Sequence, residues 1–185
     1  HTKEDSLDKC DPDILAEDTK ATLQVLYTLA MAKLLPYDFT EKLSQFRTKA
    51  EAAAKTGQRH MDCSDLLDNI AQAQTLVGQI QSQKDRYAGP AVRLYNDFVK
   101  AVSRNITHIS MTYADKYNQD SYGYTKLSYP IPLFADLERL DGLDPDSLEY
   151  GLVLTQLVKN KNRINDALNQ IIQLASLYQQ LLDSL

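Results

Sequence analysis

Apolar residues recur at alternating three- and four-residue steps through much of this chain, and that spacing is the strongest constraint on its fold. It places apolar side chains on one face of an α-helix, whereas a half-buried strand would alternate at every second residue. Six glycines and six prolines among 185 residues are few, which also favours helix. The two clearest stripes are Leu66, Ile70, Ala73, Val77 and Ile80, and then Val92, Tyr95, Val99, Val102, Ile106, Ile109 and Tyr113.

Proline, glycine and aspartate mark the expected helix ends. Asp11 can cap a helix whose first residue is Pro12, and Pro36 ends that helix. The same signal returns at Asp144 and Pro145, ahead of a last helix that continues to about residue 183. Long helices are therefore predicted at about 12–35, 38–56, 63–86, 90–113 and 144–183, with a short one at 132–140.

These helices predict an all-α fold, an antiparallel up-down bundle of four long helices with a loop and a short helix inserted before the last helix. Residues 12–185 should form this single helical-bundle domain, after an acidic N-terminal arm at residues 1–11. The first helix is apolar nearly all round in its second half, which predicts central burial. The third and fourth helices should be nearly antiparallel neighbours. The last helix exceeds its neighbours in length, which predicts a bend or an overhanging end.

Charge is concentrated at the start of the chain. Residues 1–18 carry seven carboxylates and two lysines, whereas the remainder has 18 acidic and 18 basic residues. A balanced body without a basic stripe argues against nucleic acid as a partner, because Lys and Arg on phosphates supply most of that affinity. No apolar run reaches the length of about 20 residues that spans a bilayer. The chain starts at His1 with no leader sequence, which suggests a trimmed chain or a mature form whose targeting signal has been removed.

The two cysteines, Cys10 and Cys63, precede the first and third predicted helices. In an up-down-up arrangement those helices start at the same end of the bundle, so a Cys10–Cys63 disulfide is predicted. Such a bridge would imply a periplasmic or secreted protein. The alternative is two unpaired thiols that behave as small apolar residues. A zinc site at His60 and Cys63 is not expected, because the third and fourth ligands are missing.

Five tyrosines lie between Tyr113 and Tyr129, just before Pro130 and Pro132. One interpretation is a loop that folds across the bundle end, anchored by Leu127, Ile131, Leu133 and Phe134. The other leaves tyrosines exposed, where rigid amphipathic side chains make good contact residues for a partner. The candidate partner-binding residues are Tyr122, Tyr124 and Tyr129.

The sequence holds no catalytic, cofactor-binding or metal-binding pattern that would identify an enzyme. We therefore expect a non-enzymatic, extracytoplasmic protein-binding module of the inhibitor, immunity or secretion-accessory type, with no cofactor and an unidentified protein partner. One alternative is a helical bundle that binds a small ligand or catalyses a reaction. Another is a structural oligomer that assembles through the apolar seam of the last helix.

Overall fold

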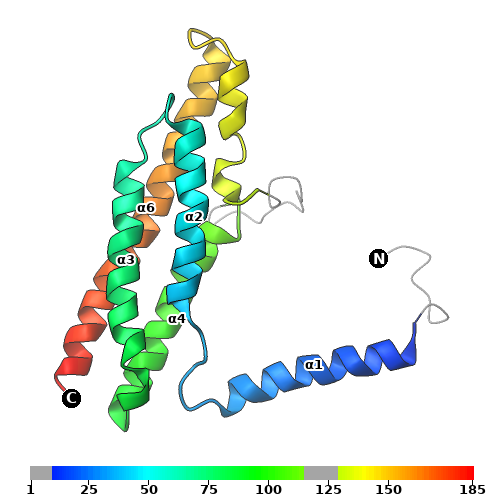
Figure 1. Ribbon diagram of the computed structural model, residues 1–185, viewed down its shortest axis with the longest axis vertical. Coiled ribbons are helices and arrows are strands. Elements are labelled where there is room, and N and C mark those ends of the chain that lie inside the picture. Colours follow the sequence, from blue (N-terminus) through cyan, green and yellow to red (C-terminus); the bar gives the residue numbers. More distant parts are fainter. Residues whose placement is uncertain (1–9, 115–128) are drawn as a thin grey trace. The chain divides into compact units, whose positions relative to one another are not determined.

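The computed structural model describes residues 10–114 and 129–185, and in these ranges it contains helices and no strands. The prediction of an all-α fold is therefore confirmed. None of the described helices is long and apolar enough to cross a membrane. The elements, shown in Figure 1, are α1 (Pro12–Met31), α2 (Phe39–Gly57), α3 (Ser64–Ser82), η2 (Lys84–Arg86), α4 (Pro90–Ser110), η3 (Pro132–Phe134), η4 (Leu137–Gly142) and α6 (Leu148–Asp183).

The chain divides into two compact units, His1–Pro36 and Tyr37–Leu185. The boundary between them lies at Pro36, in the non-helical connection between α1, which ends at Met31, and α2, which begins at Phe39. The first helix therefore ends before Pro36 and not at it. We refer to the two parts as unit 1 and unit 2.

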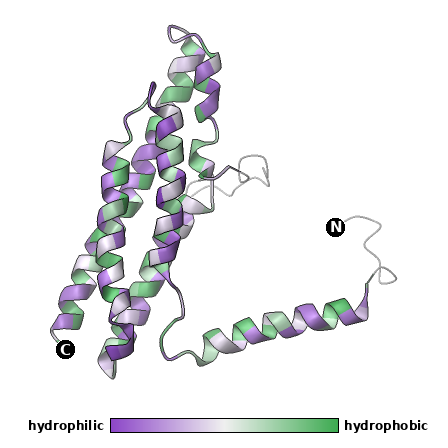
Figure 2. Ribbon diagram, in the orientation of Figure 1, coloured by the Kyte–Doolittle hydropathy of each residue, from purple (hydrophilic) through white to green (hydrophobic). Residues whose placement is uncertain are grey.

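In its described residues, unit 1 contains one regular element, α1, and none of the residues of that helix is buried. A single helix has no second element within its own unit with which to form a core, so the central burial of its apolar half stays a prediction. Figure 2 shows hydrophobic and hydrophilic residues interspersed along this helix. Its exposed apolar residues are Ile14, Leu15, Leu23, Val25, Leu26, Tyr27 and Met31.

Unit 2 is built around α6, which packs against both α3 and α4, while α2 packs mainly against α3. In Figure 1, α2 and α4 run upward and α3 and α6 run downward. The expected pairing of the third and fourth helices is wrong, because few residues of α3 approach α4. Each of their apolar stripes instead faces α6, whose 36 residues extend over about 54 Å at 1.5 Å per residue. The predicted stripes are otherwise largely buried as expected, among them Leu66, Ile70, Val77, Val99, Ile106, Ile164, Leu168 and Ile171.

One polar residue on the predicted seam of α6, Lys161, connects this helix to the start of α3. Its ammonium donates to both carboxylate oxygens of Asp65, at 3.0 Å each, and to the carbonyl of Asp62 at 2.9 Å. The amide of Asn165, one turn further along α6, donates to the same Asp65 carboxylate at 2.8 Å. Because hydrogen bonds depend on geometry more than apolar contacts do, this cluster favours one register between α3 and α6.

The helix ends follow local capping rules in most places, with two corrections. Asp11 accepts from two backbone N–H groups of α1, as predicted. The last helix, however, begins at Leu148 with Ser147 as its cap, because Asp144 forms a turn with Asp146 instead. The fourth helix ends at Ser110, so Tyr113 lies beyond it.

Gly89 is the described residue at which the backbone most clearly requires glycine. Its φ is +53°, a conformation that L side chains rarely adopt, and it precedes the first residue of α4. A Gly89→Ala substitution should lower the free energy of unfolding by about 1–3 kcal/mol through backbone strain. Urea denaturation followed by circular dichroism measures this change.

Two other glycines provide matched controls for that substitution. An added Cβ meets no atom within 4 Å at Gly142 or Gly151, and neither has a positive φ. Gly151 lies inside α6, so Gly151→Ala should raise stability by about 0.5–1 kcal/mol. Equal losses at Gly89 and Gly151 would contradict the assignment of strain to Gly89.

Candidate functional site

The two ends of the tyrosine-rich connection are held by residues one turn apart on α6. At the first end, the guanidinium of Arg163 donates to the carbonyls of Tyr113, at 3.0 Å, and Ala114. At the second end, the amide of Asn160 donates to the carbonyl of Leu133 at 2.7 Å. Asn160 is buried, so its hydrogen bond fixes the backbone that follows the tyrosines to the middle of α6.

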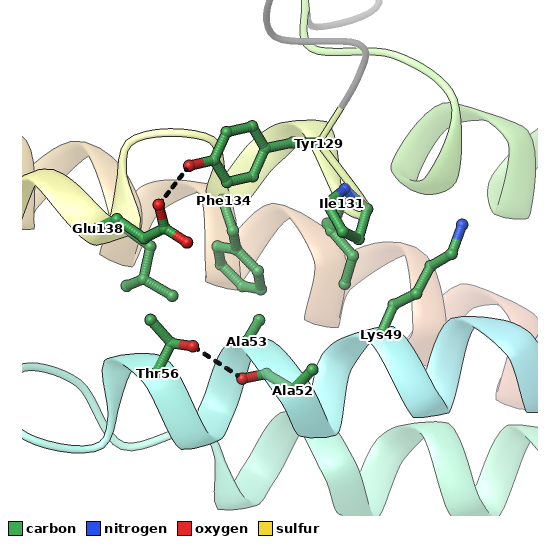
Figure 3. Close-up of a pocket in the computed structure, with 10 residues that line it drawn as sticks. Lys49, Ala52, Ala53, Thr56, Tyr129, Ile131, Phe134 and Glu138 are labelled. Carbon is green, nitrogen blue, oxygen red and sulfur yellow. Dashed lines mark hydrogen bonds between the residues drawn. The ribbon is translucent and has the colours of Figure 1, made fainter.

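Residues 129–138 form one wall of a cavity of about 180 Å³, and α2 forms the other. Figure 3 shows the side chains of both walls facing each other across it. On the side of the connection, the buried residues Ile131, Phe134 and Leu137 form the floor of the cavity. The wall formed by α2 presents small side chains, Ala52, Ala53 and Thr56. The lining is therefore mostly apolar and its residues come from distant parts of the sequence.

Tyr129 lies at the rim of this cavity, and its position is fixed by Glu138. The phenol donates to the Oε2 atom of Glu138 at 3.0 Å (Figure 3). This hydrogen bond, ahead of a smaller contribution from burial, raises the pKa of Tyr129. The ring is half-buried. Of the predicted partner-binding tyrosines, Tyr129 thus belongs to a structured site, whereas Tyr122 and Tyr124 lie outside the described residues.

Packing of the connection is largely as predicted. Ile131, Leu133 and Phe134 are all buried, whereas Leu127 lies outside the described residues. The short helix expected at 132–140 is present as two 3₁₀ segments, η3 and η4, separated by a turn. The interpretations of packed anchors and an accessible tyrosine therefore both apply to residues 129–138.

The cysteines occupy different environments in the two units. Both are free thiols in the structure; Cys10 is exposed in unit 1, whereas Cys63 is buried in unit 2. Burial raises the pKa of the Cys63 thiol, which makes it a poor nucleophile at neutral pH. The disulfide between them stays a prediction.

His60 joins three segments of unit 2 that the sequence does not connect. Its Nδ1 atom lies 3.0 Å from the Tyr150 hydroxyl and its Nε2 atom 3.1 Å from the Asp141 carboxylate. A histidine held by an aspartate resembles two members of a catalytic triad. The group on the other side of the His60 ring is, however, the phenol of Tyr150 and not a serine or cysteine. The arrangement therefore ties the α2–α3 turn to η4 and to the start of α6.

The sequence analysis missed the part of the site that α2 contributes. Gly57, the last residue of α2, is buried where α2 meets η4, and an added Cβ would lie 2.9 Å from Leu137 Cδ1. The run of small residues was the available signal, because small side chains on a helix leave room for a neighbouring segment or a ligand.

Comparisons with protein-family models, with curated proteins and with solved structures found no match for this chain.

Proposed function

We propose that this protein is a non-enzymatic protein-binding module whose contact site is the cavity between α2 and residues 129–138, which we call the α2 pocket. The size and the lining of the α2 pocket give the proposal its strongest support. A cavity of about 150 Å³ accommodates a benzene-sized group, whereas sites for drug-sized ligands run from about 300 to 1,000 Å³. At about 180 Å³ the α2 pocket suits one large apolar side chain of a partner.

The rim agrees with the same use. Tyr129 presents a large amphipathic ring whose hydroxyl is already held by Glu138. Fixing the ring before binding reduces the entropy lost on association, which is why tyrosine is common among the residues that dominate binding energy. Tyr122 and Tyr124 stay candidate contact residues on the basis of the sequence alone.

A filling substitution tests this proposal. Ala52 is exposed and lines the pocket, so Ala52→Phe should occupy it without disturbing the core. Peptides selected from a displayed random library against the wild-type protein should bind this variant at least about tenfold more weakly, a loss of about 1.4 kcal/mol. Calorimetry or fluorescence anisotropy measures the two affinities.

The matched control is Glu51→Phe, which adds the same ring at an exposed neighbour outside the pocket and removes only a solvent-exposed ion pair with Arg47. It should leave affinity and thermal stability nearly unchanged.

Tyr122→Ala, Tyr124→Ala and Tyr129→Ala should weaken binding while the melting temperature barely moves. Selected peptides that bind Ala52→Phe as well as wild type would refute the pocket as the contact site.

The alternative functions have less support. Most of the apolar seam of α6 is buried within unit 2, including Leu157, Leu168 and Ala175, which weighs against assembly through that seam. Oligomerisation through the last helix would need its exposed leucines, and a sedimentation mass equal to one chain would exclude it. The α2 pocket itself is too small and too apolar for a small-ligand site or an active site.

An extracytoplasmic location is part of the proposal and depends on the Cys10–Cys63 disulfide. Alkylation of the denatured protein isolated from its native compartment should add no mass before reduction and two adducts after it. Denaturation is needed because Cys63 is buried and its thiol reacts slowly in the folded state. Two adducts without reduction would show that no bridge exists and would remove the argument for export.

A further inference from the structure

The two ends of the α2 pocket carry opposite charges. Lys49, on α2, lies at the end near Ile131, and Glu138 lies at the other end near Thr56 (Figure 3). Both side chains are exposed, while the pocket floor between them is buried and apolar. A ligand that enters the pocket therefore meets a cation at one end and an anion at the other.

The two charged side chains differ in whether they already have a hydrogen-bond partner in the protein. Glu138 accepts the hydrogen bond of Tyr129 on its Oε2 atom. The side chain of Lys49 makes no ion pair or hydrogen bond with another residue in the described part of the chain, whereas Arg47, two positions earlier on α2, is paired with Glu51. The ammonium of Lys49 is thus the charge that remains open to a ligand.

We infer that the partner of the α2 pocket is a protein segment in which one large apolar or aromatic residue, inserted between α2 and η3, is flanked by a carboxylate that meets Lys49. This inference rests on the proposed function. It adds the chemistry of the bound segment and the orientation in which that segment lies in the α2 pocket. The apolar residue supplies most of the affinity, because it leaves water. The carboxylate sets which way the segment runs, since exposed charge pairs contribute orientation more than affinity.

Three small probes of equal shape separate these contributions: 3-phenylpropionate, 3-phenylpropanamide and 3-phenylpropylamine, which are anionic, neutral and cationic. Each carries one phenyl group, and the affinity per atom that is typical of bound ligands places the dissociation constants of such fragments in the millimolar range. Titrations of the full chain, followed by NMR shifts of the methyl groups of Ile131 and Leu137, measure the affinities. The anion should bind about two- to fivefold more tightly than the amide, and the amine more weakly.

Lys49→Glu should reverse this order. Lys55→Glu makes the same change in net charge on an exposed residue of α2 that does not line the pocket, and it should keep the wild-type order. Ala52→Phe should abolish the shifts for all three probes.

The possible failures are distinguishable. If all three probes bind wild type with equal affinity, or if Lys55→Glu reverses the order as Lys49→Glu does, the directional role of Lys49 is wrong while the pocket itself stands. If no probe shifts the pocket methyl groups at concentrations on the order of ten millimolar, the α2 pocket is not an apolar binding site and the proposed function fails with it.

Discussion

Replacing Gln81 by leucine is expected to lower the free energy of unfolding by about 2–4 kcal/mol, although the change makes the core more apolar. Gln81 is buried on α3, and its amide completes the backbone hydrogen bonding at the start of α2. Its Oε1 atom accepts from the Phe39 N–H at 2.8 Å, and its Nε2 atom donates to the Tyr37 carbonyl at 2.7 Å. Leucine would leave both backbone groups without these partners; the Phe39 N–H is buried, where an unsatisfied group costs about 1–3 kcal/mol, and the part-buried Tyr37 carbonyl adds less.

Urea denaturation monitored by circular dichroism measures this loss, and Gln79→Leu is the matched control. Gln79 lies on the exposed side of the same helix, so its replacement should change stability by no more than about 0.5 kcal/mol. If the two variants proved equally stable, the hydrogen bonds of Gln81 would contribute nothing to the attachment of α2.

Phe98→Ala is expected to cost about 3–5 kcal/mol, the largest effect of any substitution proposed for this protein. Phe98 on α4 has no exposed surface, and its ring centroid lies 5.7 Å from that of Tyr178 on α6. Truncation removes the apolar transfer energy and leaves a cavity where these two helices meet, which rigid neighbours fill only in part. The measurement is the same denaturation experiment.

Leu177→Ala is the comparison for this variant. Leu177 is next to Tyr178 in the chain but 51% exposed, so its truncation should cost less than about 1 kcal/mol. A loss for Phe98→Ala as small as that for Leu177→Ala would mean that the α4–α6 contact adds little to the stability of unit 2.

Much of the helical content could be predicted because helix signals are local. The stripe from Leu66 to Ile80 and the cap at Asp11 depend on residues within four positions of one another. Phe98 was missed because α4 is covered by α6 and also contacts η3 and α2, so its buried arc is wider than one stripe. Gln81 was missed because a polar side chain is buried only when distant groups are placed to pair with it.

The candidate site could be predicted only in part, because one of its walls is recognisable from local sequence and the other is not. The tyrosine-rich stretch and its proline-containing end could be recognised from composition, and Tyr129 is at the rim of the α2 pocket. The opposite wall comes from residues about 75 positions earlier in the chain, and no short-range pattern relates Ala52 to Phe134. Their approach is decided by the packing of η4 against α2 and of η3 against α6.

The sequence by itself determined where helices form and which face of most of them is buried, because hydrogen bonding and side-chain periodicity within a helix involve near neighbours. Only the tertiary structure decided that α3 and α4 each pack on α6 rather than on one another, that Lys161 on an apolar seam meets Asp65, and that a pocket forms beside Tyr129. These outcomes depend on matching surfaces between helices far apart in the chain, where several pairings bury similar apolar area and shape and polar contacts select one.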